Sequence, residues 1–143
     1  MPKLPPIEKV YEAWTALTDN RVKLNPDNSA TVESSDGAKS YTIRFSGDKF
    51  SSDDNATYWR GYPGYPVIAV LMLQGRLPYD KDEAALWNNV NWKEINTRFK
   101  NNYAEAVAEV AAQRNIDLAR SQKAAEQVME ALQNLPIEIK RKI

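Results

Sequence analysis

Residues 66–75 read PVIAVLMLQG, and this stretch organises the fold predicted for the chain. Pro66 suits the first position of a helix, and Gly75 suits the position just after a helix ends. Residues 67–73 are apolar on every side, which is typical of a helix buried in a core. A buried strand is the alternative, because short apolar runs are ambiguous, but the Pro and Gly positions favour a helix. The run is far too short to cross a bilayer, so no membrane association is expected.

The chain before this stretch predicts one helix and then a small sheet. Apolar residues recur on one helical face between residues 6 and 19, after Pro5 and Pro6. Short segments suited to strands follow at residues 21–24, 30–34, 41–45 and, less completely, 49–51. The turns between them carry Asn, Asp and Gly, at residues 25–28, 36–37 and 47–48. We therefore expect an antiparallel β-meander.

The chain after this stretch predicts helices only. A short helix is expected from Asp80 to about Val90, a long amphipathic helix over 92–114, and a last one over 117–135. The last two should pack as an antiparallel helical hairpin, because a short connection joins them. The fold class is therefore α+β. A mixed half (about 1–78) and a helical half (about 79–143) are expected to share one core in a single domain.

The composition excludes several kinds of chemistry. Among 143 residues there is no Cys and no His. Zinc sites of the usual kind and nucleophiles that depend on an imidazole or a thiol are therefore excluded. Residues 51–55, SSDDN, lack the spacing of a calcium loop and are interpreted as a turn or helix cap. No metal, no cofactor and no enzyme activity is predicted. A small enzyme that uses only carboxylates, Tyr, Lys or Ser stays open as an alternative.

The net charge is zero, because the chain has 19 basic and 19 acidic residues. No overall positive field would attract nucleic acid. The compact basic cluster Lys140-Arg141-Lys142 is interpreted as the solvated end of the last helix, where positive charge suits the helix dipole. The first residues lack the apolar run of a signal peptide, so a cytoplasmic location is expected.

The most distinctive segment is an aromatic loop at residues 58–66, YWRGYPGYP. Aromatic rings beside a cation can form a protein-binding hot spot or stack on nucleic-acid bases. The alternative is that the rings fill the core beneath the loop. Of the rings, Trp59 and Tyr62 are the best candidates for exposure. The predicted partner-binding residues are Tyr58, Trp59, Arg60, Tyr62 and Tyr65.

The order of features from Tyr41 to Leu73 resembles the SWIM zinc-finger family. In that family a similar order is found: a strand, a Cys-x-Cys pair, a loop, and then a Cys-x-His pair at the start of an apolar helix. Residues 61–71, GYPGYPVIAVL, follow its downstream part. The family's ligand positions fall at Ser52, Asp54, Gly64 and Pro66. The first two positions can shift along the sequence by one or two residues. Every ligand is absent, so the resemblance implies a ββα frame without zinc.

These features together predict a non-catalytic interaction module on a metal-free SWIM-like frame. SWIM domains are regarded as interaction modules for protein or DNA, and the zero net charge favours a protein partner. One alternative is nucleic-acid binding through the aromatic loop with Arg44, Lys49 and Arg60. Self-association through the Ala-rich C-terminal helices is compatible with protein binding.

Overall fold

The computed structural model describes residues 3–143 and contains a five-stranded mixed sheet in the order β1-β2-β3-β4-β5. The strands are β1 (Val22–Asn25), β2 (Ser29–Glu33), β3 (Ser40–Ser46), β4 (Lys49–Ser52) and β5 (Glu138–Ile139). The first four form the predicted antiparallel meander. The short β5 was not predicted, and it adds parallel to β4 from the far end of the chain.

The two faces of the sheet differ, because successive residues of a strand point to opposite sides. Ala30, Ile43 and Ser52 lie opposite one another across β2, β3 and β4, and the first two are fully buried. Their neighbours Thr42 and Arg44 belong to the other face, which is polar. Tight turns join the strands, and Asn28 and Gly47 adopt the left-handed conformation that such turns require. Below, the two sides are called the inner and the outer face.

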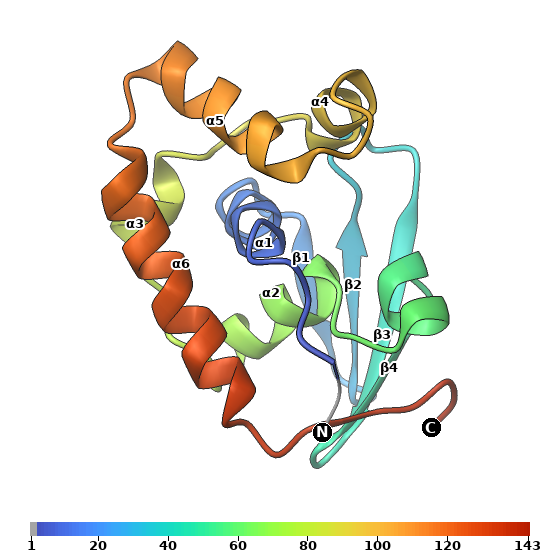
Figure 1. The fold of residues 1–143 in the computed structure, drawn as a ribbon. Helices are drawn as coiled ribbons and strands as arrows, with labels where there is room; N and C mark the ends of the chain where they lie inside the picture. The colour runs from blue at the N-terminus through green and yellow to red at the C-terminus, as the bar shows by residue number, and fades with distance from the viewer. Residues whose placement is uncertain (1–2) are drawn as a thin grey trace.

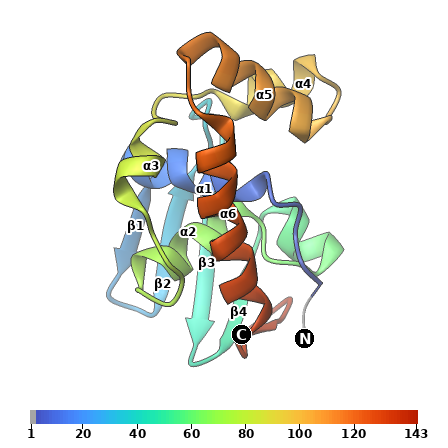
Figure 2. The ribbon, with the colours of Figure 1, turned by 60° about the vertical axis from the view of Figure 1, so that its left-hand side comes forward.

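Helices cover the inner face, as Figures 1 and 2 show. They are α1 (Lys9–Thr18), α2 (Tyr65–Leu73), α3 (Lys81–Ala85), α4 (Trp92–Arg98), α5 (Tyr103–Arg114) and α6 (Leu118–Gln133). A single π-helical turn, η1 (Ala56–Arg60), connects β4 to α2. Within residues 3–143, no helix is both long and apolar enough to cross a membrane.

Helix α2 is the buried helix predicted from residues 66–75. It begins at Tyr65, one residue before Pro66, and all of Pro66 to Met72 is buried. Gly75 follows its end in the left-handed conformation. The buried side chains of α1, α2, the sheet, and helices α3 to α6 belong to one hydrophobic cluster. Residues of both halves therefore share a core, with Trp14, Trp87 and Phe50 among its largest fully buried side chains.

The single long helix predicted over 92–114 is wrong. The chain forms two helices, α4 and α5, because Lys100 and Asn101 both take the left-handed conformation, with φ of 53° and 64°. Asn102 then begins α5, and its side-chain oxygen accepts a hydrogen bond from the Glu105 N–H at 3.3 Å. Amphipathic spacing continues through the break, which is why periodicity alone missed it.

The last two helices also differ from the predicted hairpin, since α5 and α6 meet at a corner in both views (Figures 1 and 2). Asn115, with φ of 53°, forms that corner. Helix α6 is held instead by Ser121, which is fully buried. Its hydroxyl accepts a hydrogen bond from Trp87 Nε1 at 3.1 Å and donates one to Glu83. A polar group buried on α6 thus directs that helix toward α3.

The interpretation of Lys140-Arg141-Lys142 as a helix end is also wrong. Helix α6 ends at Gln133, and Ile137 is buried before the chain joins the sheet as β5. The Lys140 N–H donates to the Phe50 carbonyl at 2.8 Å. The basic residues therefore follow a strand and lie beside β4, in a segment that we call the tail (residues 140–143).

Candidate functional site

The predicted aromatic loop begins within η1 and ends in α2, and its five predicted residues are divided between two surfaces. Tyr58 and Trp59 stack on each other, with ring centroids 4.8 Å apart and an interplanar angle of 28°. Trp59 is 67% exposed, whereas Trp14, Trp87 and Trp92 are buried. Arg60, Tyr62 and Tyr65 line a different cavity. Adjacent residues in a helical turn point in different directions, so a run of aromatic residues does not make one site.

Arg141 of the tail completes the first surface. Its guanidinium lies 5.4 Å from the centroid of the Tyr58 ring and 5.4 Å from that of Trp59. A cation at this distance is attracted by the negative face of each ring. Two aromatic residues and one cation, more than eighty positions apart in the sequence, therefore form one exposed cluster.

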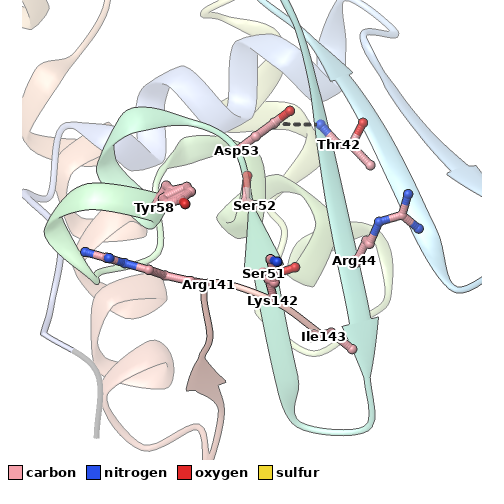
Figure 3. A pocket seen from close by; sticks show the side chains of 9 residues that line it. All are labelled: Thr42, Arg44, Ser51, Ser52, Asp53, Tyr58, Arg141, Lys142 and Ile143. Atoms are coloured by element: carbon pink, nitrogen blue, oxygen red, sulfur yellow. Dashed lines mark hydrogen bonds between the residues drawn. The ribbon is translucent and has the colours of Figure 1, made fainter.

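A pocket of about 410 Å³ adjoins this cluster on the outer face of the sheet, and we call it the tail pocket. Figure 3 shows Arg141 extending from the tail toward Tyr58. The Thr42 N–H donates to the Asp53 carboxylate at 2.9 Å across one wall. The lining residues come from β3, β4, η1 and the tail: Thr42, Arg44, Ser51, Ser52, Asp53, Tyr58, Arg141, Lys142 and Ile143.

A second cavity of about 320 Å³ lies on the helical side of the molecule, and we call it the tyrosine cleft. Tyr41, Tyr62, Tyr65 and Tyr103 line it, brought together from β3, the loop after η1, α2 and α5. Tyr41 and Tyr65 pack edge to face at 6.4 Å. Burial raises the pKa of both these phenols above their ordinary value of 10.0, at which a phenol is already protonated at neutral pH and can donate a hydrogen bond.

An ion pair forms part of the wall of the tyrosine cleft. Lys9 Nζ lies 2.9 Å from Glu12 Oε2, and both side chains are largely buried. The same ammonium lies 4.0 Å from the centroid of the Tyr103 ring. Burial raises the pKa of Glu12 above its ordinary value, and the nearby Lys9 charge only partly opposes this. A buried charge pair beside an open cavity is typical of binding sites, although structural ion pairs perturb pKa values as well.

A hydrogen-bond network, which we call the Asp54 network, joins the end of β4, the turn η1 and the residue before α2. The buried Asp54 carboxylate accepts hydrogen bonds from the Ser52 hydroxyl and from both the N–H and the hydroxyl of Thr57. The Thr57 hydroxyl in turn accepts from the Gly64 N–H at 2.9 Å. The predicted turn or cap at residues 51–55 therefore exists, since Asp54 caps the start of η1.

Gly64 packs directly against this carboxylate. A Cβ placed on Gly64 would lie 2.2 Å from Asp54 Oδ2 and 3.2 Å from Ala56 Cβ. The backbone conformation at Gly64 is an ordinary extended one, with φ of −73°. Glycine is therefore required here because of space, and not because of backbone strain. Ser52, Asp54 and Gly64, three of the four positions singled out by the SWIM resemblance, are joined in this one network.

Neither cavity brings together the ligands of a metal site. Among residues 3–143, no group of three acidic side chains is placed to hold a metal ion. The tail pocket holds the Asp53 carboxylate and the tyrosine cleft holds the Glu12 carboxylate, which is already paired with Lys9. What the two cavities offer is cations, hydroxyls and aromatic rings, which suit the recognition of polar or anionic groups.

Sequence reasoning missed the residues that complete both cavities. The sequence pattern places Arg141 at a helix end, and it places Lys9 and Glu12 on an ordinary amphipathic helix. The spacing of three residues between Lys9 and Glu12 is compatible with a helical ion pair, but nothing local shows that both would be buried. Tyr103 counts only as an apolar position on the long predicted helix. Convergence of such distant residues is a property of the tertiary structure alone.

Comparison with known proteins places the chain in one family, whose model covers most of it. No curated protein and no solved structure matches it. One family model matches residues 2–138, which includes both cavities except for the tail. The chain therefore belongs to the family described as uncharacterised conserved protein UCP014422.

Proposed function

We propose that this protein is a non-catalytic interaction module that binds a protein partner through the stacked pair Tyr58–Trp59, Arg141 and the adjacent tail pocket. The exposed Trp59 is the single observation that carries the proposal. Leaving most of an indole in water has a cost that burial against a partner removes. Trp, Tyr and Arg are also the residues most enriched in the hot spots of protein interfaces.

The charges around the stacked pair define the partner's chemistry. Arg44, Arg141 and Lys142 line the tail pocket, and Asp53 is the one acidic residue among the lining residues. A segment with acidic residues and one large apolar side chain fits best. Its carboxylates would meet the two guanidinium groups, which suit such pairing, and its apolar side chain would cover Trp59.

A single-stranded nucleic acid is the other partner that cations beside stacked rings can recognise. The balanced net charge of the chain favours protein, because phosphate contacts depend on a broad positive field. A protein partner is therefore favoured, and nucleic acid is included in the test.

The test uses short synthetic peptides and intrinsic fluorescence. Trp59 is the exposed one of four Trp residues, so a ligand on this surface should shift its emission to the blue and protect it from acrylamide quenching. The panel contains an acidic peptide with one Leu or Phe, its charge-reversed form, a neutral form and an oligo-dT strand. We expect the acidic peptide to bind most tightly.

Variants connect that signal to the surface. Trp59→Ala should weaken acidic-peptide binding by at least about tenfold, as expected for a hot-spot residue. Arg141→Glu should reduce the same affinity. Leu86→Ala, which removes another exposed apolar side chain far along the chain, is the matched control and should change nothing. Tightest binding to oligo-dT with a steep salt dependence, or binding that ignores Trp59, would overturn the proposal.

We also propose that the frame is a metal-independent relative of the SWIM type. Strands β3 and β4, the turn η1 and helix α2 follow one another in the order that the resemblance implies. The Asp54 network supports this proposal, since it links Ser52, Asp54 and Gly64 by hydrogen bonds where a metal would otherwise cross-link them. Buried hydrogen bonds of this kind can fix a loop without a cation.

A further inference from the structure

The tyrosine cleft has a different composition from the tail pocket, and the proposed protein interaction makes no use of it. Its walls come from α1, the turn after β2, β3, η1, the loop after η1, α2, α4 and the start of α5. Small-molecule sites combine aromatic walls with a few convergent polar groups, and the tyrosines here supply the aromatic part. Its volume of about 320 Å³ lies at the lower end of the range for such sites.

The charge in this cleft is positive. Lys9, Arg60 and Lys93 line it together with a single carboxylate, that of Glu12. Glu12 is already matched by Lys9 at 2.9 Å. Neither Arg60 nor Lys93 forms an ion pair with a carboxylate of residues 3–143. Two cations at the cavity are therefore free to meet an anion.

Two acidic residues outside the cleft, Asp36 and Glu94, line a separate shallow pocket together with Lys93. Asp36 is close enough for the Lys93 ammonium to lower its pKa, after the larger effects of hydrogen bonds from the Ala38 N–H and the Ser34 hydroxyl. Asp36 is exposed and lies outside the lining of the cleft. Its attraction to Lys93 is therefore screened by water.

We propose that the tyrosine cleft binds a small phosphorylated, hydroxyl-bearing molecule of the sugar-phosphate type. Arg60 and Lys93 would hold the phosphate, because guanidinium and ammonium groups both bind phosphate oxygens. Tyr41, Tyr62 and Tyr103 offer hydroxyl groups and ring faces to the body of the ligand. Asn96 and Asn101 add amide groups that both donate and accept, which suits a molecule with several hydroxyls.

The experiment is calorimetric titration, with the thermal midpoint as a second readout. The probes are glucose 6-phosphate, ribose 5-phosphate, glycerol 3-phosphate, glucose and inorganic phosphate. At least one phosphorylated probe should bind with a dissociation constant below about 1 mM and raise the midpoint, whereas glucose and inorganic phosphate should each bind at least about tenfold more weakly. Inorganic phosphate that binds as tightly as every sugar phosphate would overturn the proposal.

The variants Arg60→Gln and Lys93→Gln should each weaken sugar-phosphate binding by about tenfold, as expected for loss of a charged hydrogen bond. Both side chains are exposed, so the fold should tolerate the changes. Lys23→Gln, on β1 and in neither cavity, is the control and should bind as the unmodified protein does. If no sugar phosphate at about 10 mM gives a measurable heat of binding or a shift of the thermal midpoint, the proposal is wrong.

This inference is independent of the proposed protein interaction. Trp59→Ala should leave sugar-phosphate affinity unchanged, because Trp59 does not line the cleft. Loss of sugar-phosphate binding in that variant would contradict the assignment to the tyrosine cleft.

Discussion

The tail pocket and the tyrosine cleft lie on opposite sides of the same strand, β3. Thr42 and Arg44 line the tail pocket on the outer face, whereas Tyr41 lines the tyrosine cleft. The turn η1 divides its residues in the same way, with Tyr58 in the first and Arg60 in the second. The tail pocket lies between the outer face of the sheet and the tail, whereas helices and loops supply most of the walls of the cleft. Neighbouring residues thus supply two separate surfaces when the backbone alternates their directions.

The Asp54 network contributes to both cavities, because Ser52 lines the tail pocket and Tyr65, next to Gly64, lines the tyrosine cleft. We therefore expect Gly64→Ala to damage both cavities and to reduce stability more than any change confined to one of them. The new Cβ would meet the Asp54 carboxylate, which three hydrogen bonds hold in place. We expect a loss of about 2–3 kcal/mol in the free energy of unfolding, as for overpacking of a buried site. Urea denaturation measures it.

A double-mutant cycle identifies the cause. In an Asp54→Ala background the clash is relieved, so Gly64→Ala should cost clearly less than it does alone. Gly37→Ala is the control for the loss of a glycine, since nothing lies within 4 Å of its added Cβ and only its left-handed backbone is strained. Equal costs of Gly64→Ala in both backgrounds would show that Asp54 is not the obstacle.

Glu12→Gln should affect the tyrosine cleft and not the tail pocket. Its effect on the free energy of unfolding should be moderate and should depend on pH. The folded protein binds a proton at Glu12 more tightly than the unfolded chain does, because burial raises this pKa from 4.5. The contribution of Glu12 to the free energy of unfolding is therefore fully present below pH 4.5 and is lost as pH rises through the raised pKa. Relative to Glu12→Gln, the unmodified protein should therefore lose stability as pH rises across this range.

Paired denaturation curves from pH 4 to pH 8 test this expectation, with Glu109→Gln as the control for an acidic residue on a helix surface. A stability difference between the unmodified protein and Glu12→Gln that stays constant over that range would mean that Glu12 titrates normally. The variant should leave Trp59 quenching unchanged, which separates the cleft from the tail pocket.

The tail pocket alone should respond to Arg141→Ala, with a small effect on stability. The interaction between an exposed cation and aromatic rings contributes about 0.5–1 kcal/mol, which corresponds to a shift of about 3 °C or less in the thermal midpoint. Acrylamide quenching of Trp59 should increase, because the guanidinium no longer covers part of its ring. Lys142→Ala, the neighbouring residue in the tail, is the matched control and should leave the quenching as it is.

Chelation should have no effect on either cavity. Addition of EDTA to the purified protein is expected to leave the thermal midpoint unchanged, since the Asp54 network joins its members by hydrogen bonds alone. A structural zinc contributes on the order of 10 kcal/mol in small domains, so its removal would be obvious. A large fall in the midpoint with EDTA would contradict the metal-independent frame.

Local sequence signals predicted the elements that local interactions determine. The PVIAVLMLQG stretch predicted α2, and the turn residues around Asn28, Gly37 and Gly47 predicted the meander. These features depend on the conformational preferences of a few adjacent residues. The α+β class followed from them.

The rest depended on contacts that no local pattern encodes. Two residues, Glu138 and Ile139, are too few to give a strand signal, and they pair because β4 offers an open edge. The break at Lys100 and Asn101 interrupts a helical pattern without a Pro or Gly. The candidate site was predicted as one loop, but its partners Arg141, Lys9 and Tyr103 come from distant segments, so its division into two cavities could not be foreseen.

The late position of β5 has a consequence for the order of folding. Strand β4 ends at residue 52, but β5, which pairs with its free edge, is synthesised only with residues 138–140. At about 5–20 residues per second on the ribosome, β4 stays an unpaired edge for several seconds after it emerges. An open edge can pair with other chains during that time. Refolding of the full chain removes this delay, and pulsed hydrogen exchange would then show how fast the edge pairs, through protection of the Lys140 N–H. On the ribosome, the wall of the tail pocket that the tail supplies forms after the walls from β3 and β4.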